Sequence, residues 1–448
     1  MPMTRRAALA GFLTLPLARV RADAPPAGDA LLLLMSDQHS AMEGAAGVLA
    51  IADAALAARR GVPAVAIVNG DVFEKGNAVA SRGRGEADWA FLAALRRRLP
   101  VILNLGNHEP DFDDMAAVVA RLRAADVAVV SNIRDARTGE LLAPDHLDVP
   151  LGARRMRLVA FATDEANTYP VPVRPAIRIP AAVPWAMENL PRLLDPGADL
   201  NLVLSHAGIA ADRRILPILP DGTLMLGGHD HLMLEARTGA TRYVHTGSWN
   251  RAVAFAGIGF GAGSAAPGIA LASAPVDPLA GDAAHAAVVR DFLAAHMTAE
   301  DREVLFTIPA ALPLGEAARR ACAIVARGTG RGVGLIAHTT FGTGLPAGPV
   351  NRLAYDAFFR FDGDAMASDA DPAAIRAVLE RANQDDLPLE RRTGDFCYAA
   401  PGMEGAGGVA AADWVVKNAD RYLGRGDLAF TTPAGAKLKA RVMAGFRG

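Results

Sequence analysis

Two histidines one residue apart follow a glycine pair in the stretch LMLGGHDHLM, residues 225–234. His229 and His231 are two of only ten histidines in the chain. In an extended chain the side chains at positions i and i+2 point to the same side, so these imidazoles could bind metal ions together. A polar turn between two strands explains the same residues without a metal. The stretch alone leaves both interpretations open.

Other short apolar runs also end in side chains that bind metals. ALLLLMSDQH ends at Asp37 and His39, AVAIVNGD at Asp71, PVILNLGNHE at Asn107 and His108, and LNLVLSH at His206. Short apolar runs bounded by polar or glycine turns are typical of buried strands. Ligands of parallel sheets bind at the carboxyl ends of the strands. Five distant runs are therefore expected to bring Asp, Asn and His side chains to one edge.

The segments between the first of these runs have the pattern of helices. They cover residues 41–59, roughly 86–98 and roughly 113–124. An alternation of strands and helices predicts an α/β fold with a largely parallel core sheet.

The polar set at these strand ends, with His108 left aside, suits a pair of transition-metal ions. Mixed nitrogen and oxygen ligands favour Zn²⁺, Mn²⁺ or Fe over Ca²⁺ or Mg²⁺ alone. Seven ligands are too many for one tetrahedral site, but they suit two ions that share a carboxylate. Two ions roughly 3.5–4 Å apart can bind both the attacking and the leaving oxygen of a displacement. The set consists of Asp37, His39, Asp71, Asn107, His206, His229 and His231.

The motifs DQH, GD, GNHEPD, SHAG and GGHDH, in this order and spacing, resemble those of the calcineurin-like metallophosphoesterases. The branch that they resemble most is the exported bacterial 5'-nucleotidase family, over roughly residues 29–275. The resemblance implies an α/β/β/α sandwich of four layers. It also implies one metal held by Asp37, His39, Asp71 and His231, and a second held by Asp71, Asn107, His206 and His229, with Asp71 as the bridge.

The resemblance also assigns a catalytic pair. His108 matches the family's catalytic histidine, which is not a metal ligand, and Asp111 matches the carboxylate that orients it. Two divalent ions would provide a hydroxide near neutral pH for attack on phosphorus. His108 would stabilise the transition state or protonate the leaving group. Asp111 would fix the tautomer of His108.

Two further residues near these motifs have more than one possible role. His245, in YVHTGSW, lies where the family usually has a different residue. It could contact the substrate or have a structural role. Asp230, between the two metal histidines, points to the other face of an extended chain and is expected to be a loop residue.

The C-terminal part resembles the smaller α+β C-terminal domain of the 5'-nucleotidases. The stretches that carry this resemblance are VGLIAHTTFGTGLPAGPVNRLAYDAFFRFDGD, residues 333–364, and YLGRGDLAF, residues 422–430. Phe361 and Phe430 fall where the family stacks a base between aromatic rings, although core packing is an equal alternative for each.

This part of the chain departs from the family where the substrate phosphate is held. The family's motif asparagine is Ala337 and its motif arginine is Gly342. Arginine binds phosphate with two parallel hydrogen bonds, so its loss is not conservative. His338, Thr339 and Thr340 replace the family's glycine run and could contact a different ligand.

Three functions follow from these features. The first is a two-metal phosphoesterase of the 5'-nucleotidase type, acting on a small anionic phosphoester or nucleotide. The second is a hydrolase of a non-nucleotide substrate on the same centre, such as a sulfur conjugate, as in the related thiosulfohydrolases. The third is a non-catalytic binding protein, which is disfavoured because every expected ligand and His108 are present. A net charge of −2 and scattered Lys and Arg predict no nucleic-acid partner.

The length of 448 residues predicts more than one domain. We expect a metal-binding domain over residues 28–275, a linker with a helix over 276–305, and a substrate domain over 306–448. Cys322 and Cys397 could form a disulfide or be two small buried residues.

The first 22 residues have the layout of an export signal. Arg5 and Arg6 precede a short apolar stretch and then small residues, which resembles a twin-arginine signal. The alternative is a frayed basic tail. No later stretch is long and apolar enough to span a membrane. We therefore expect a periplasmic or secreted protein.

Overall fold

The computed structural model describes residues 24–261, 266–277, 281–433, 435 and 437–448. The expected export signal, residues 1–22, lies outside the described residues. The chain divides into two compact units between His296 and Met297. Among the described residues, no helix combines the length and the apolar character that crossing a membrane requires.

The first sheet of the N-terminal unit has four parallel strands, as the sequence predicts, and two antiparallel strands at one edge. Three helices connect the parallel strands and lie close to the positions that the sequence predicts: α2 (Met42–Ala58), α4 (Glu86–Arg96) and α5 (Met115–Ala124). A short helix, α3 (Ala78–Arg82), precedes α4. The strands, in their order across the sheet, are β14 (Gly268–Pro275), β13 (Ala252–Gly259), β1 (Ala30–Met35), β2 (Ala64–Asn69), β3 (Val101–Asn104) and β4 (Ala128–Val130).

The second sheet of this unit also contains four parallel strands, with one antiparallel strand at each edge. Helices α6 (Ala182–Leu193) and α7 (Ile209–Ile215) follow its strands, and β5 (Arg134–Asp135) pairs with β8 (Ile177–Arg178) outside it. The strands, in order, are β11 (Met233–Thr238), β12 (Thr241–Thr246), β10 (Leu224–Gly227), β9 (Leu200–His206), β7 (Arg154–Ala162) and β6 (His146–Leu151).

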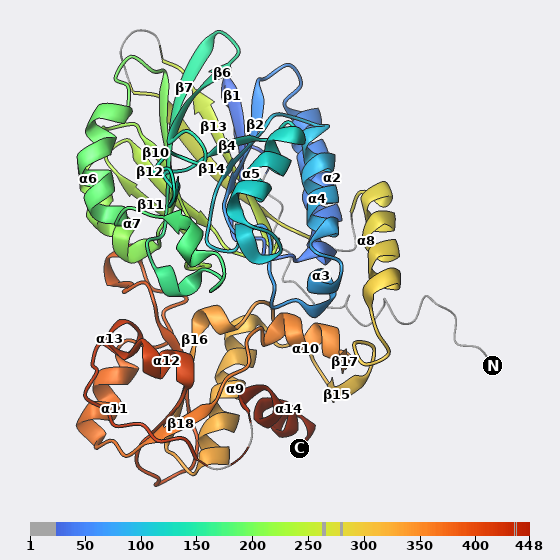
Figure 1. Cartoon of the computed structure of the whole chain (residues 1–448), viewed down its shortest axis with the longest axis vertical. Helices are drawn as coiled ribbons and strands as arrows, with labels where there is room; N and C mark the ends of the chain where they lie inside the picture. The colour runs from blue at the N-terminus through green and yellow to red at the C-terminus, as the bar shows by residue number, and fades with distance from the viewer. Residues whose placement is uncertain (1–23, 262–265, 278–280, 434, 436) are drawn as a thin grey trace, which may run out of the picture. The chain divides into compact units, whose positions relative to one another are not determined.

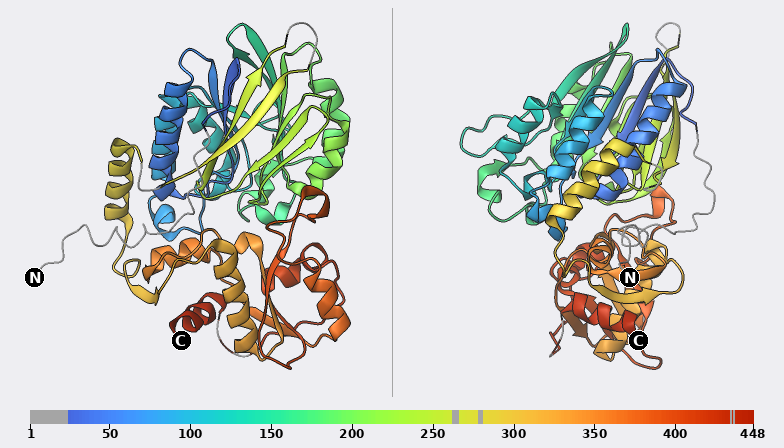
Figure 2. Two further views of the ribbon diagram at one scale, coloured as in Figure 1. Left: turned by 180° about the vertical axis from the view of Figure 1, so that it is seen from behind. Right: turned by 90° about the vertical axis from the view of Figure 1, so that its right-hand side faces the viewer.

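Alternate residues of each central strand face two different cores. In β1, Leu31 and Leu33 pack with the helices α2, α4 and α5, whereas Leu32 and Leu34 pack against the second sheet. Figures 1 and 2 show α2 and α4 on one outer side of the paired sheets and α6 and α7 on the other. The unit is therefore the expected α/β/β/α sandwich, and α8 (Ala283–His296) packs outside α2 and α4.

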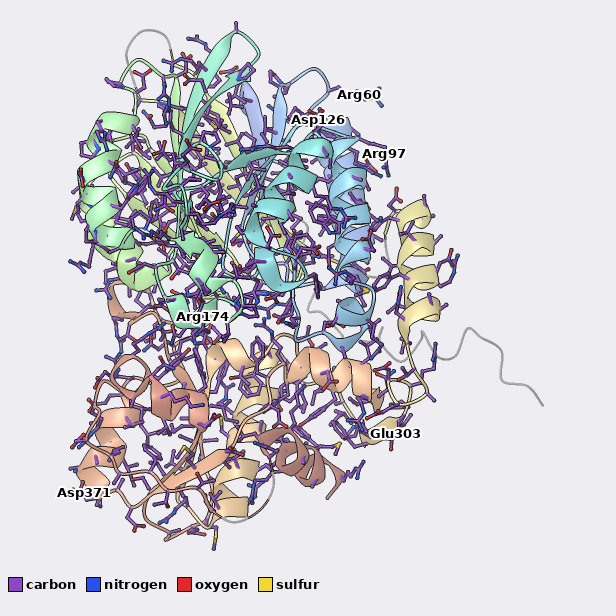
Figure 3. The ribbon with its side chains drawn as sticks, viewed as in Figure 1. Arg60, Arg97, Asp126, Arg174, Glu303 and Asp371 are labelled. Atoms are coloured by element: carbon purple, nitrogen blue, oxygen red, sulfur yellow. The ribbon has the colours of Figure 1, made fainter. Side chains whose placement is uncertain are left out.

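The helices of the first sheet run back from the carboxyl ends of its strands. Arg60, Arg97 and Asp126 follow the ends of α2, α4 and α5, and Figure 3 shows them together at one end of the unit. Figure 3 shows Arg174 at the opposite end. Strands β1, β2 and β3 finish at this second end, where the expected metal ligands begin.

The C-terminal unit is built on a smaller sheet with β16 at its centre. Helix α9 (Leu314–Thr329) packs on β16 and β19. The sheet order is β18 (Ala365–Ser368), β20 (Val409–Ala412), β16 (Val333–Ala337) and β19 (Cys397–Pro401). A separate pair joins β15 (Val304–Ile308) to β17 (Gly348–Asn351). The remaining helices are α10 (Arg352–Phe358), α11 (Pro372–Leu379), α12 (Asp413–Lys417), α13 (Ala419–Tyr422) and α14 (Leu438–Arg447).

Candidate metal centre

The loops after β1 and β2 stay paired beyond the ends of their strands. The backbone N–H groups of Asp37 and His39 donate to the carbonyl oxygens of Gly70 and Asp71, at 3.0 and 2.9 Å. The N–H of Ser40 donates to Val72 in the same way, at 2.9 Å. This continued ladder brings Asp37, His39 and Asp71 together at one place.

The expected ligands form two groups. In the first, His39 Nε2 lies 2.8 Å from His231 Nε2 and 3.8 Å from Asp37 Oδ1. In the second, His206 Nε2 lies 3.1 Å from Asp71 Oδ2, and His229 Nδ1 lies 2.9 Å from Asn107 Oδ1. Asp37, His39 and His231 can offer ligand atoms to one ion, and so can Asp71, His206 and His229.

The Asp71 carboxylate lies beside both groups. Its Oδ2 is 3.1 Å from His206 Nε2 and 3.9 Å from His39 Nε2. Its Oδ1 accepts the backbone N–H of His108 at 2.8 Å. The side chain is therefore held by the main chain between the two histidine groups.

The donor set in this centre fits metal ions. His206 Nδ1 donates to the carbonyl oxygen of Asn69 at 2.6 Å, so Nε2, which lies 3.1 Å from Asp71 Oδ2, is the nitrogen that can exchange its proton for a metal ion. His39 Nδ1 lies 3.1 Å from Glu74 Oε2, and its Nε2 faces His231 Nε2. Neutral imidazoles each offer one lone pair, so ring nitrogens gathered around buried carboxylates form a donor set that suits divalent transition-metal ions.

Most of the expected ligands have an unusual backbone conformation. Asp37, His39, Asp71, His229 and His231 have φ between 50° and 79°, which is the left-handed region. Residues other than glycine rarely adopt it, and such residues cluster at functional sites.

The Asp71 carboxylate favours positive charge on the histidine nitrogens around it. Burial raises the pKa of Asp71, but His206 and His108 outweigh it and hold this pKa well below its usual range. Burial lowers the pKa of His206, but the Asp71 carboxylate more than compensates and raises it to about 10. A carboxylate that stays ionised beside imidazoles is suited to bind divalent cations.

His108 and Asp111 form the expected pair at the rim of this centre. His108 Nδ1 lies 3.0 Å from Asp111 Oδ2, and the His108 side chain is 18% exposed. Burial lowers the pKa of His108, but Asp111 and Asp71 raise it to about 9. Asp111 therefore favours the protonated form of the imidazole, which is suited to offer a proton to a bound molecule.

Three glutamates close to the centre were missed by the sequence reasoning. Glu109 accepts backbone N–H groups from Asp71 and Val72, at 3.0 and 2.9 Å, and so joins the loops after β2 and β3. Glu74 lies behind His39, and Glu165 Oε2 lies 3.6 Å from His229 Nε2. Glu109 stands inside the GNHEPD motif, which was the one signal that could have revealed it.

The glycine pair before His229 leaves room for polar groups on both faces of its strand. A Cβ atom at Gly227 would lie 2.0 Å from His245 Nε2, and one at Gly228 would lie 2.5 Å from Ser36 Oγ and 2.9 Å from His206 Nδ1. Side chains at either position would displace groups that hold the centre.

His245 belongs to a buried network behind this pair. Its Nε2 lies 2.5 Å from the Tyr243 hydroxyl, which donates to Asp212 Oδ2 at 2.6 Å, and Ser205 donates to the other Asp212 oxygen. All four side chains belong to residues that are almost fully buried. These contacts give His245 a structural role. Asp230 is a buried loop residue and accepts the Ile209 N–H at the start of α7.

The C-terminal unit contains the expected substrate residues in different surroundings. Phe361 is 40% exposed and lies under the Arg360 guanidinium, and Phe430 is half-buried. Both lie outside the buried core of this unit. His338 is buried, with its ring stacked on Phe396 and its Nδ1 2.9 Å from the Phe396 carbonyl oxygen. Ala337, at the end of β16, is fully buried.

The two cysteines are free thiols. Cys322, in α9, and Cys397, in β19, are both buried, and the Cys322 thiol donates to the Tyr398 carbonyl oxygen at 3.1 Å. Burial raises the pKa of both thiols. Of the two alternatives, the structure shows two small buried residues.

The fold and the site define a class of enzyme. Residues 31–233 match the family model for calcineurin-like phosphoesterases, as the motifs predict. Together with the clustered ligands, this makes the protein a metal-dependent phosphoester hydrolase.

Solved structures extend the likeness along nearly the whole chain. A 5'-nucleotidase precursor from Thermus thermophilus superposes with a TM-score of 0.63 at 18% identity, over 93% of this chain and 96% of the other. The sulfate thiohydrolase SoxB from the same species gives 0.67 at 16% identity, over 95% of each chain. A Candida albicans 5'-nucleotidase gives 0.61 at 11%, over 94% and 98%. No curated protein sequence matches the chain. At these identities the likeness to solved structures establishes the fold alone.

We expect Gly228→Ala to destabilise the N-terminal unit, because its Cβ would press on Ser36 and His206. Overpacking of this kind typically costs about 1–3 kcal/mol. The matched control is Gly259→Ala, where the nearest atom to the added Cβ is 3.9 Å away. Urea unfolding of both variants measures the difference, and equal midpoints would show that the space at Gly228 is not needed.

Proposed function

We propose that this protein is a two-metal hydrolase of phosphate monoesters, of the 5'-nucleotidase type. The observation that carries the proposal is the position of Asp71. One buried carboxylate lies beside the nitrogen atoms of His206 and His39, which belong to two different ligand groups. A bridging carboxylate of this kind is what two ions roughly 3.5–4 Å apart require.

The proposed ligands follow the two groups. Asp37, His39, Asp71 and His231 would hold the first ion, and Asp71, Asn107, His206 and His229 the second. The short distances from His39 Nε2 to His231 Nε2, 2.8 Å, and from His229 Nδ1 to Asn107 Oδ1, 2.9 Å, support this division. The mixture of nitrogen and oxygen ligands favours Mn²⁺, Zn²⁺ or Fe.

The chain's own side chains would perform the remaining chemistry. When bound, such ions supply a hydroxide near neutral pH and neutralise charge on the phosphoryl oxygens. The protonated imidazole of His108 would donate to the leaving oxygen of the ester as that bond breaks. Asp111 holds the imidazole through Nδ1, which leaves Nε2 for the substrate. Asp111 is itself fixed by the Lys75 N–H at 2.6 Å.

The substrate is proposed to be a small anionic phosphoester or nucleotide that the C-terminal unit holds weakly. Ala337 and Gly342 supply neither an amide nor a guanidinium group. Exposed Phe361 offers an aromatic face for a base, and Phe430 is the second candidate for that role. His338 remains a candidate substrate contact.

We also propose that the protein is exported to the periplasm or secreted, through the twin-arginine-like signal of residues 1–22. A twin-arginine route suits a protein that folds around its metals before export. Cleavage would follow Ala22.

The experiment that tests the function is a hydrolysis screen of the Mn²⁺-loaded full chain. Nucleotides, simple aryl phosphates and sulfur conjugates are compared under the same conditions. Release of phosphate from nucleotides or aryl phosphates supports the proposal. Cleavage of sulfur conjugates alone would assign the second function, and no turnover of any class would leave a binding protein.

Asp71→Ala is expected to remove both ions, because this carboxylate is the proposed bridge. Elemental analysis of the purified variant after dialysis against Mn²⁺ gives the number of ions per chain. His231→Ala serves as the comparison and should retain the second ion, because the His231 ring nitrogen lies near His39 and Asp37 of the first group. Loss of a single ion in Asp71→Ala would contradict the bridging role.

His108→Asn should lower kcat by about 10²–10⁴, the range for a general acid–base group. The metal content should stay at the level of the unmodified protein, because His108 is not a proposed ligand. Steady-state kinetics with an aryl phosphate and elemental analysis of the same samples check both statements. A variant that loses its ions would show that the motif has been misassigned.

Restoration of the family's phosphate contacts should improve nucleotide turnover selectively. In Ala337→Asn with Gly342→Arg, kcat/KM for AMP should rise more than kcat/KM for an aryl phosphate. A hydrogen bond to a charged group contributes about 1.5–3 kcal/mol, which corresponds to roughly 10- to 150-fold in affinity. If the unmodified protein already prefers AMP by several orders of magnitude, the missing contacts are irrelevant.

A further inference from the structure

In each proposed ligand group one histidine has a carboxylate on its outer side. His39 Nδ1 lies 3.1 Å from Glu74 Oε2, and His229 Nε2 lies 3.6 Å from Glu165 Oε2. The inner nitrogen of each ring faces the centre, because His39 Nε2 meets His231 and His229 Nδ1 meets Asn107. The two carboxylates therefore stand behind the ligand nitrogens and do not compete for the ions.

The two carboxylates differ in how firmly they are held. The Glu74 side chain is 2% exposed, and its Oε1 accepts the Gly76 N–H at 2.9 Å. The Glu74 N–H donates to Ser40 Oγ at 2.9 Å, and Ser40 in turn donates to buried Asp88 at 2.7 Å. Glu74 is thus held by hydrogen bonds on both its backbone and its side chain, and it is almost fully buried.

The Glu165 side chain has a looser environment, although its backbone hydrogen-bonds with Thr163 and Thr168. It lies on the loop before the short helix η2 (Ala166–Thr168), and its side chain is 29% exposed. Its distance of 3.6 Å from His229 is that of an ion pair and is too long for a hydrogen bond. Water screens such a pair more strongly than it screens a buried one.

We propose that Glu74 and Glu165 are positioning residues, one for each ion, and that they make the two metal sites unequal. The ion at Asp37, His39 and His231 is bound more tightly, and the ion at Asn107, His206 and His229 exchanges more readily. The reason is that a carboxylate behind a ligand histidine orients the ring and raises the basicity of its inner nitrogen. The carbonyl oxygen of Asn69 behind His206 also orients a ring, but it carries no charge. This inference rests on the proposed two-metal function.

Metal binding is a better test than activity for this proposal. Glu74 also lies in a group with His108 and Asp111 whose ligand atoms are within 4.8 Å of one another. A change at Glu74 could therefore alter kcat without any effect on the ions. Titration of the metal-free full chain with Mn²⁺, followed by calorimetry and by electron paramagnetic resonance, reports the two binding steps directly.

Glu74→Gln should weaken the tighter step by about 10- to 100-fold, the usual effect of losing such a partner. Glu165→Gln should weaken the other step by less than tenfold. The control is Glu188→Gln, an exposed position on α6, which should change neither step. Ser40→Ala, which loosens Glu74 but keeps its charge, should weaken the tighter step by less than Glu74→Gln does.

The outcomes separate this inference from the proposed function. Two equal affinities in the unmodified protein, or a larger effect of Glu165→Gln than of Glu74→Gln, would overturn the inference and leave the two-metal function standing. An unmodified protein that binds no Mn²⁺ or only one ion would overturn the proposed function itself. Two unequal steps that respond to the two variants separately are the expected result.

Discussion

The ionised carboxylate of Asp71 is fully buried between histidines that follow strands of both sheets. His39 follows β1 of the first sheet, and His206 ends β9 of the second. A buried charge is costly unless it is paired and hydrogen-bonded. The His108 N–H and the histidines near Asp71 meet that requirement, and Glu109 binds the N–H groups of Asp71 and Val72. The packing of the two sheets must therefore hold the loops that carry His39, Asp71 and His206 in fixed positions.

Backbone strain is concentrated at the same place. Left-handed geometry at a non-glycine residue costs of order 1–3 kcal/mol. Five such residues among the expected ligands cost about as much as the whole net stability of a domain, about 5–15 kcal/mol. The two sheet cores and the continued ladder between the loops after β1 and β2 offset this cost. A centre held in this way is shaped before any ligand arrives.

The sequence predicted the elements that have a simple hydrophobic pattern. Buried strands are short apolar runs, so the ends of β1, β2, β3, β9 and β10 could be read directly, and with them the clustered ligands. Glu74, Glu109 and Glu165 could not be read in this way, because a glutamate in a loop has no periodicity. Their roles depend on contacts with residues far along the chain, such as His229 with Glu165. The structural role of His245 likewise depends on the pairing of β12 with β10, which sets it opposite Gly227.

The proposed ions would join the two sheets as a cross-link, since their ligands come from strands of both. Unfolding would then release the ions, so the stability of the N-terminal unit would follow the law of mass action. Free metal at 1,000 times the dissociation constant adds about 4.1 kcal/mol per site. The lifetime of the folded protein would therefore depend on the metal supply of its compartment.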